Sequence, residues 1–442
     1  MTDYRPMAQL PEAAGYKAGD VLVLVGELFG RGYANGLVEE AHRIGMTVIG
    51  TTVGRRDTDG TLRCLTEEEL AEAESILGGR IINVPLEAGI DMIEVDGEPS
   101  ISEQMKQLKL DEWDKISFSD EYLDKAVAAG CASFSLNLKV FVKELEAVVP
   151  AGANVLVSHV MAGGFPRSRI FMVLLNRVFK GTGDKYLSSR ELWESGIGRM
   201  CQASFNVVTA DTFRCLLDET AGLRQRVSSE GGQVRYTAYG YHGTGVLLGG
   251  EYRWQSYIAY MPGWAKMRLE NIAAEATANG ISATVFNCPE IQTNSSVLFL
   301  GVEIPLYRLL AAIRSKVGEE CSSPLFKSCQ AMLAEGEDLE NMLDKAEAYT
   351  TSPLITGMLD FATWPQHNTQ EQAELMLAAS AELMAMHADS KQLVCAELSR
   401  IVFMSTGKLI LHGSWKPEAP VLWLNHDLIA DLLADQRGSG IL

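Results

Sequence analysis

The stretch VLVLVGELFGRG, residues 21–32, decides the fold because it joins a strand to a glycine-rich turn. Val21 to Val25 is an unbroken apolar run, which is typical of a strand buried on both faces of a parallel sheet. A helical pattern follows from about Tyr33 to Ile44, and Met46 to Thr52 has the pattern of a second strand. The order strand, turn, helix and strand is the first unit of a doubly wound α/β sheet.

The alternation of strands and helices continues along the chain. Thr66-Glu-Glu-Glu69 is typical of a capping box that opens a helix, and residues 88–150 are numerous enough to hold extra helices. Further strands are expected at residues 80–84, 154–158, 233–239 and 283–287. The sequence therefore predicts an α/β fold, a Rossmann-type doubly wound parallel sheet with helical insertions and a mainly helical C-terminal region.

The composition argues against several classes of protein. The 442 residues carry a formal net charge of −19 and show no basic stripe, so a nucleic-acid-binding role is not expected. The eight cysteines form no C-x-x-C pair and, with the seven histidines, no zinc-binding spacing, which predicts free thiols and no metal. The longest apolar run, Val297 to Ile313, is interrupted by Glu303 and Arg308, which predicts no membrane span.

Residues 1–17 lack the apolar core of a signal peptide. We therefore expect a soluble cytoplasmic protein. The sequence leaves a monomer and a homodimer equally open.

The turn Gly26-Glu-Leu-Phe-Gly30-Arg-Gly32 separates the first predicted strand from the first predicted helix. A dinucleotide pyrophosphate needs close approach of the backbone and free N–H groups at a helix N-terminus. The G-x-x-x-G-x-G spacing is that of short-chain dehydrogenase-type folds. We predict that Gly26, Gly30, Arg31, Gly32 and Tyr33 bind a dinucleotide cofactor, with a plain glycine turn as the alternative.

Arg55 and Arg56 follow the second predicted strand by a few residues, where a dinucleotide-binding chain meets the adenosine ribose. An acidic residue at this place binds the 2′-hydroxyl of NAD, whereas arginine accommodates the 2′-phosphate of NADP. No carboxylate precedes the two arginines after the strand. The pattern favours NADPH as the cofactor. NADH stays possible because Asp57 could bind a 2′-hydroxyl, and the alternative for both arginines is a solvated charged loop.

Tyr257 and Lys266 are separated by eight residues in the stretch Tyr252 to Ala278, which has a helical pattern. A reductase of a polarised C=C or C=O bond needs a hydrogen-bond donor at the carbonyl oxygen, and a tyrosine beside an ammonium group can provide it. We predict both residues as catalytic, and the lysine can also hold the nicotinamide ribose. A chance Tyr–Lys pair is the alternative. Other tyrosines compete for the role, namely Tyr239, Tyr241, Tyr252 and Tyr260.

Two polar loops follow predicted strands, at the sheet edge where ligands bind. In the first loop, Ser158 and Ala162 are expected to lie against the cofactor ribose, and His159 is more often structural at such a position. In the second loop, Thr293 can bond the nicotinamide amide. The alternative for the second loop is an ordinary helix cap at residues 294–295.

The chain resembles the FabV-type trans-2-enoyl-ACP/enoyl-CoA reductases of the short-chain dehydrogenase/reductase superfamily, and most of all their divergent FabMG branch. The most specific match is the eight-residue spacing between Tyr257 and Lys266, which differs from that of shorter-spaced short-chain reductases. The other matches, in the same order along the chain, are Gly26-x-x-x-Gly30-x-Gly32-Tyr33, Ser158 to Arg169, Gln292 to Ser296 and Ile304-Pro-Leu-Tyr307.

The resemblance implies an enzyme of fatty acid synthesis that transfers hydride from NAD(P)H to the C=C bond of a trans-2-enoyl-ACP or enoyl-CoA. Tyr257 would hydrogen-bond the thioester oxygen, and Lys266 would hold the ribose and phosphates of the cofactor. Tyr241 is the best match to the family's second active-site tyrosine, provided that a few residues are inserted before Tyr257. The main FabV group carries an acidic residue after the second strand and prefers NADH, so Arg55 and Arg56 depart from its pattern.

The pattern of predicted elements and the extent of the resemblance, roughly residues 20–330, suggest how the chain is divided. We expect a dinucleotide-binding reductase domain in residues 1–330, with an insertion at about 88–150. Residues 331–442 would form a mainly helical extension packed on the same domain, with candidate short strands near Leu409 and Leu422. Three rival functions stay open: a short-chain-type ketone or hydroxysteroid reductase, a catalytically inactive NADPH-binding sensor, and a structural or scaffold protein that binds no cofactor.

Overall fold

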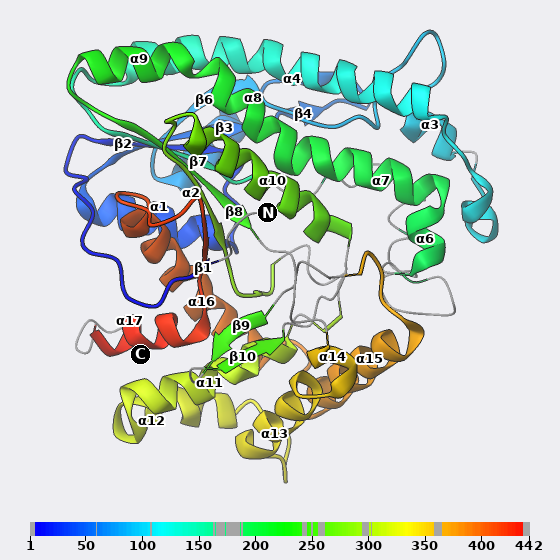
Figure 1. The fold of residues 1–442 in the computed structure, drawn as a ribbon, viewed down its shortest axis with the longest axis vertical. Coiled ribbons are helices and arrows are strands. Elements are labelled where there is room, and N and C mark those ends of the chain that lie inside the picture. Colours follow the sequence, from blue (N-terminus) through cyan, green and yellow to red (C-terminus); the bar gives the residue numbers. More distant parts are fainter. Residues whose placement is uncertain are drawn as a thin grey trace.

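An eight-stranded parallel sheet is the centre of the computed structural model and confirms the predicted fold class (Figure 1). The structure describes residues 5–435, except residues 59, 107, 162–163, 165–172, 174–185, 187–188, 241–244, 249–250, 255–260, 294–299, 302 and 358–364. The strand order is β1-β12-β11-β8-β7-β2-β3-β6. The strands are β1 (Arg5–Pro6), β2 (Val21–Val25), β3 (Thr47–Thr52), β6 (Arg80–Pro85), β7 (Val155–His159), β8 (Val234–Gly240), β11 (Ala283–Asn287) and β12 (Val421–Trp423).

The strand order reverses beside β2. β3 and β6 continue the sheet on one side of β2, whereas β7, β8 and β11 continue it on the other side. Val23 of β2 pairs with Ile49 of β3 and with Val157 of β7, so these three strands end at the same edge. In open α/β sheets, ligands bind at the carboxyl ends of the strands where the order reverses.

Each face of the sheet has its own hydrophobic core because side chains alternate along a strand. Leu22 and Leu24 point into one core, and Val21, Val23 and Val25 point into the other. The helices of the first core include α1 (Tyr33–Ile44), α2 (Glu67–Leu77) and α16 (Val394–Gly413). The helices of the second core include α4 (Asp120–Val148), α8 (Thr212–Glu219), α9 (Ala221–Ser229) and α10 (Met261–Ala278).

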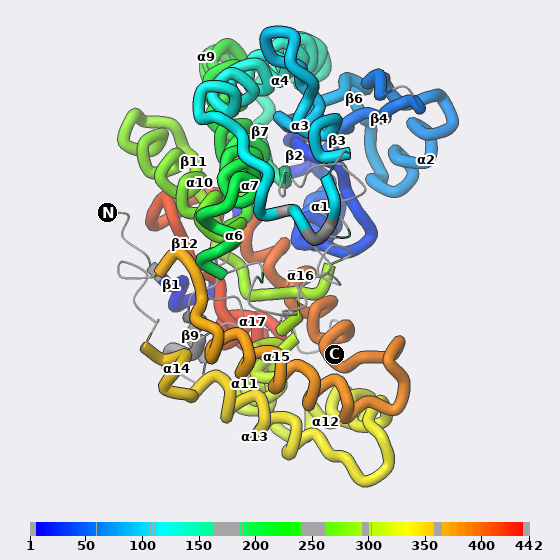
Figure 2. The backbone as a smooth tube through the Cα atoms, turned by 90° about the vertical axis from the view of Figure 1, so that its right-hand side faces the viewer, coloured from blue at the N-terminus to red at the C-terminus, as the bar shows by residue number. Residues whose placement is uncertain are grey.

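The C-terminal part of the chain contributes to the same sheet. β12 pairs with β11 and with β1, and α16 crosses α1. The prediction of a strand near Leu422 is confirmed, but the one near Leu409 is wrong, since that apolar run is the buried side of α16. Figure 2 shows the other helices that follow residue 300 gathered at the end of the molecule away from α4. They are α11 (Ile304–Val317), α12 (Glu319–Gln330), α13 (Leu339–Thr350), α14 (Pro353–Thr356), α15 (Gln370–Ala385) and α17 (His426–Asp435).

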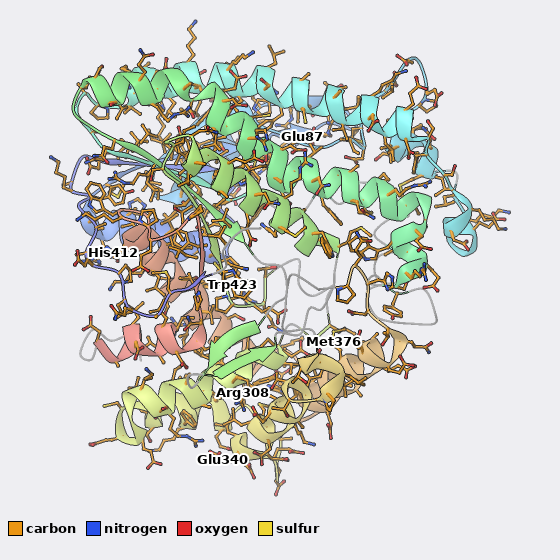
Figure 3. The ribbon with its side chains drawn as sticks, in the orientation of Figure 1. Glu87, Arg308, Glu340, Met376, His412 and Trp423 are labelled. Atoms are coloured by element: carbon orange, nitrogen blue, oxygen red, sulfur yellow. The ribbon has the colours of Figure 1, made fainter. Side chains whose placement is uncertain are left out.

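The contact between α1 and α16 is close because both helices have glycine at the crossing. A Cβ atom placed on Gly407 would lie 2.1 Å from the backbone nitrogen of Leu37, and one on Gly36 would lie 2.4 Å from the carbonyl oxygen of Phe403. Further along, His412 of α16 (Figure 3) bonds a carboxylate oxygen of Glu40 on α1 at 2.7 Å. The helix that follows the glycine turn is therefore held by a helix from the far end of the chain.

The predicted insertion holds α3 (Ile101–Lys106), a 3₁₀ helix η1 (Leu110–Lys115) and the 29-residue helix α4. Among the described residues, α4 alone is long and apolar enough to cross a membrane by length and composition. Phe134, Leu138 and Phe141 on one side of α4 are buried in the core under the sheet, while Leu136 on the other side is 65% exposed. A core helix of this kind passes such a test, so α4 is weak evidence for a membrane span.

Two short hairpins and a set of short helices complete the described chain. β9 (Gly245–Leu248) pairs with β10 (Glu251–Trp254). The predicted helical stretch from Tyr252 therefore begins too early, and α10 starts at Met261. The other hairpin joins β4 (Arg55–Arg56) to β5 (Leu62–Arg63). The short helices are α6 (Arg190–Glu194), α7 (Gly196–Asn206) and a π-helical turn, η2 (Val207–Asp211).

Candidate active site at the carboxyl edge of the sheet

The glycine turn lies between β2 and α1, at the point where the strand order reverses. Gly26 has a φ of +123°, and its N–H donates to the Thr51 hydroxyl at 2.8 Å. A Cβ on Gly26 would lie 2.7 Å from the Val160 side chain, so the turn can follow this path only with glycine. Gly32 precedes α1 without a side-chain cap, which leaves the first N–H groups of the helix to bind an anion.

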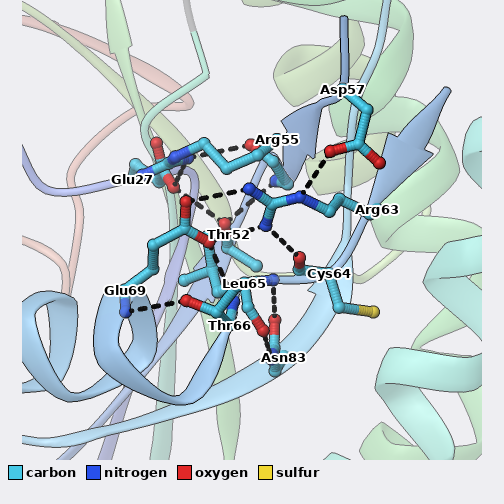
Figure 4. A network of polar contacts seen from close by, with 11 residues as sticks. Glu27, Thr52, Arg55, Asp57, Arg63, Cys64, Leu65, Thr66, Glu69 and Asn83 are labelled. Carbon is cyan, nitrogen blue, oxygen red and sulfur yellow. Dashed lines mark hydrogen bonds and ion pairs between the residues drawn. The ribbon is translucent and has the colours of Figure 1, made fainter. Parts of the chain in front are cut away.

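The two arginines after β3 are each paired with a carboxylate. Arg55 Nη1 lies 2.8 Å from Glu27 Oε1, and the same oxygen accepts from the Thr52 hydroxyl at 2.7 Å (Figure 4). Arg56 forms an ion pair with Glu87, which follows β6. A 2′-phosphate would therefore have to compete with Glu27 and Glu87 for these guanidinium groups.

Asp57 was a candidate to bind the 2′-hydroxyl of NAD. In the structure it bonds Arg63, with 3.0 Å between Asp57 Oδ1 and Arg63 Nε. The same guanidinium bonds Glu69, the third helical residue of α2. Thr66 and Glu69 form the predicted capping box of that helix. This network ties the β4–β5 hairpin to α2 (Figure 4).

Two cavities lie on either side of the glycine turn. The larger, about 390 Å³, extends over the carboxyl ends of β2, β3, β6 and β7, and is lined by Gly26, Val53, Ala88 and Val160. The smaller, about 360 Å³, lies between the turn and α2. Volumes of this size are at the lower end of the range of small-molecule sites. The charged residues that line the larger cavity are Glu27, Arg56, Glu87 and Asp91.

Lys266 of α10 reaches the carboxyl edge beside β8. Its Nζ atom donates to the carbonyl oxygen of Tyr239 at 2.8 Å. Burial lowers the pKa of Lys266 to about 8, an effect that Cys288 and Glu270 oppose. His159, at the end of β7, bonds the Thr212 hydroxyl at 2.8 Å and is buried, as expected for a structural histidine.

Tyr33 and Tyr239 bring the start of α1 against the end of β8. Their rings lie 5.7 Å apart at an angle of 39°. The Tyr33 hydroxyl donates to the carbonyl oxygen of Pro289, in the loop after β11. In that loop the N–H of Gln292 donates to Ser399 of α16 at 2.8 Å, next to Thr293.

The structure brings together part of the predicted site. The turn residues, Ser158 and Thr293 lie at strand ends on the carboxyl edge or in the loops that follow them, and the side chain of Lys266 reaches this edge from α10. Tyr257, Tyr241 and Ala162 lie outside the described residues. Among those described, no three His, Cys, Asp or Glu side chains are grouped to hold a metal ion.

Glu27 and Glu87 determine the charge of the site, and neither was predicted from the sequence. Glu27 lies inside the glycine turn and Glu87 directly follows a predicted strand, so both positions were visible in the sequence. Their ion pairs with Arg55 and Arg56 were not visible, because they join loops about thirty residues apart.

Comparison with known proteins agrees with this geometry. A family model for the enoyl-acyl carrier protein reductase FabMG matches residues 3–433. The chain belongs to this family. The predicted resemblance to FabMG is confirmed, and with it the class of enzyme, an oxidoreductase of enoyl thioesters.

Two solved structures are similar over the whole chain. An apo structure of FabMG is 44% identical, covers 99% of each chain and has a TM-score of 0.93. An NADH-bound structure of FabMG is 37% identical, covers 98% of this chain and 99% of the other, and has a TM-score of 0.75. No curated protein matches the chain at a significant level.

Proposed function

We propose that this chain reduces the C=C bond of trans-2-enoyl thioesters carried on acyl carrier protein, with NADH as the reductant. The observation that carries the proposal is the position of Lys266, whose ammonium lies at the carboxyl edge of the sheet at the end of β8 in a chain of the FabMG family. We further infer a more distant relation to the FabV-type reductases from the spacing between Tyr257 and Lys266.

The residues at the edge of the sheet fit a dinucleotide. The backbone of Gly26 to Gly32 leaves room for a pyrophosphate beside the uncapped N-terminus of α1. The carboxylates of Glu27 and Glu87 line the larger cavity and can accept hydrogen bonds from ribose hydroxyls. Lys266 can donate to the second ribose from the other side of the turn.

NADH, when bound, supplies the hydride that is added to the β-carbon of the enoyl thioester. We assign Tyr257 to donate a hydrogen bond to the thioester oxygen, where negative charge develops as the hydride is added. We assign Tyr241 as a second catalytic tyrosine, and Lys266 would supply the positive charge that favours an ionised tyrosine. A proton from Tyr257 or from solvent then completes the reduction at the α-carbon.

The cofactor preference follows from the charges of the larger cavity. Three carboxylates and one guanidinium line it, and Arg56 is already neutralised by Glu87. A 2′-phosphate placed near these carboxylates would be repelled, whereas a 2′-hydroxyl can donate to them. Of the two cofactors that the sequence left open, we therefore propose NADH for this chain.

The test is the loss of absorbance of the reduced nicotinamide, with NADH and NADPH in parallel. The substrates are a crotonyl thioester on acyl carrier protein, crotonyl-CoA and a simple ketone. We expect oxidation that depends on the thioester and is faster with NADH, and Tyr257→Phe should slow it about a hundredfold or more. Oxidation with the ketone alone, or none with either cofactor, would contradict the proposal.

A further inference from the structure

Glu270 is a carboxylate buried where α10 packs on the sheet. Its exposed fraction is 0%, and its helical neighbours Leu269 and Ala273 belong to the second hydrophobic core. A carboxylate in such surroundings is strongly unfavourable unless an opposite charge lies near it. The position of Glu270 therefore needs an explanation.

Lys266 precedes Glu270 by one turn of α10, so the two side chains lie on the same face of the helix. The Lys266 ammonium donates to the carbonyl oxygen of Tyr239 near the end of β8 at 2.8 Å. The Glu270 Oε1 atom accepts from the side-chain amide of Asn287, the last residue of β11, at 3.4 Å. Asn287 pairs in register with Gly240 of β8. The ammonium and the carboxylate thus reach the ends of two adjacent strands, which are about 4.8 Å apart.

The other titratable groups that act on Lys266 carry no negative charge at neutral pH. Burial lowers the pKa of Lys266 to about 8, and both Cys288 and Glu270 oppose this effect. Burial also raises the pKa of the Cys288 thiol, so the thiol stays protonated. The pKa of His159 is lowered to about 3 by burial and by the charge of Lys266, so the imidazole is neutral. Among the described groups around Lys266, Glu270 is therefore the one that can supply a negative charge.

The charged residues on the outer side of α10 are paired with one another. Arg268 forms an ion pair with Asp211 of η2 at 2.7 Å, and Glu275 forms one with Arg214 of α8 at 2.8 Å. Arg268, Arg214 and Glu275 are about half exposed, so solvent screens their effect on a buried ammonium.

We propose that Glu270 is a positioning residue for Lys266, the buried counter-charge that keeps its ammonium protonated at the end of β8. The inference rests on the proposed function, because it assumes that Lys266 binds the cofactor. Glu270 touches neither cofactor nor substrate in this role and acts through Lys266. Without the carboxylate, burial would lower the pKa of Lys266 further, and the lysine would be neutral at the pH where the enzyme works.

The test is the pH dependence of NADH binding in Glu270→Gln, followed by the fluorescence of NADH. Glutamine keeps the shape of the side chain and an oxygen that can accept from Asn287, but it removes the charge. An opposite charge within about 4–6 Å shifts a pKa by about 1–3 units. The pH midpoint at which NADH affinity falls should therefore move from about 8 in the wild type to about 7 or below. NADH binding should be almost equal to that of the wild type at pH 6 and about threefold weaker at pH 7.5.

Three further variants separate the charge from the shape. Glu275→Gln, the same change on the outer side of α10, should leave the midpoint near 8. In a Lys266→Arg background, Glu270→Gln should leave the pH dependence unchanged, because arginine stays charged over this range. Glu270→Asp keeps the charge but withdraws it, so its midpoint should lie between those of the wild type and Glu270→Gln. If Glu270→Gln does not fold, Glu270→Asp decides in its place.

A merely structural Glu270 would give a different result. Its loss would lower the thermal midpoint of unfolding and leave the pH midpoint of NADH binding at the wild-type value, which would overturn the inference. The same shift of the pH midpoint in the Lys266→Arg background would overturn it too, because the carboxylate would then act on another group. A pH midpoint in Glu270→Asp equal to that of the wild type would also count against it.

Failure of the inference and failure of the proposed function are distinguishable. If the wild type oxidises NADH with an enoyl thioester but Glu270→Gln keeps the wild-type pH midpoint, the inference alone fails. If Glu270→Gln moves the midpoint but the wild type reduces no enoyl thioester, the proposed reaction fails and the role of Glu270 stands. Absence of NADH binding in the wild type would overturn both.

Discussion

Replacement of Gly407 by alanine tests whether α16 positions the helix of the cofactor turn. The added Cβ would lie 2.1 Å from the nitrogen of Leu37 and 2.2 Å from the carbonyl carbon of Gly36. Carbon atoms pack at about 3.5 Å or more, so α1 and α16 would have to separate by roughly 1.3 Å. Both atoms belong to the backbone of α1, so no side chain can rotate away.

The expected free energy follows from two opposing effects. Alanine in a helix interior is about 1 kcal/mol more favourable than glycine. Overpacking of a close contact costs about 1–3 kcal/mol, and this contact is at the severe end. We therefore expect Gly407→Ala to lower the free energy of unfolding by about 2 kcal/mol. A displaced α1 should also weaken NADH binding.

The assay is urea unfolding together with NADH titration of the folded variant. The matched control is Gly222→Ala in α9, where the nearest atom to an added Cβ is the carboxylate oxygen of Glu146, at the flexible end of a side chain. That variant should be as stable as the wild type or more stable. If Gly407→Ala behaved like Gly222→Ala, and bound NADH as the wild type does, the reasoning about α16 would be refuted.

Three further predictions concern charge. Glu87→Gln should raise the ratio of kcat/KM for NADPH to kcat/KM for NADH about tenfold, because Arg56 is freed for a 2′-phosphate. Glu72→Gln, at the other cavity, is the control and should leave this ratio unchanged. NADH affinity should fall as the pH rises through about 8, where burial places the pKa of Lys266, and a Lys266→Arg variant should lack this step in direct binding titrations. Burial raises the pKa of Glu40, but hydrogen bonds from Arg43 and His412 outweigh burial and lower this pKa to about 2. Ionised Glu40 therefore stabilises the fold above its ordinary pKa of about 4.3, and this contribution is lost as the pH falls toward 2. Thermal unfolding should show Glu40→Gln less stable than the wild type at neutral pH and equal to it near pH 2.

The parts of the fold that the sequence predicted are those with a strong local pattern. β2, β3 and the turn between β2 and α1 combine continuous apolar runs with glycine at fixed positions, and each was predicted within one or two residues. The strand expected near Leu409 failed because a short apolar run has the same composition in a buried helix as in a buried strand. The helical stretch predicted from Tyr252 began too early for a related reason. Residues 251–254 pair with β9, a short strand that has no strong pattern of its own.

The candidate site was less accessible from the sequence because its properties come from pairs of distant residues. NADPH was favoured because Arg55 and Arg56 looked free in the sequence, and only the folded chain brings Glu27 and Glu87 to them. No spacing along one segment of the chain reveals these ion pairs.

The crossing of α1 and α16 also affects the order in which the protein can mature during synthesis. A ribosome synthesises α1 and the glycine turn well before α16, which begins about 350 residues after the end of α1. Until then, the face of α1 that α16 covers is exposed to solvent, and its apolar side chains are open to chaperones or to other nascent chains. Because α16 holds α1 in place, NADH should not bind a nascent chain stalled before residue 394, and affinity for the cofactor should be acquired only after α16 has been synthesised and has packed on α1.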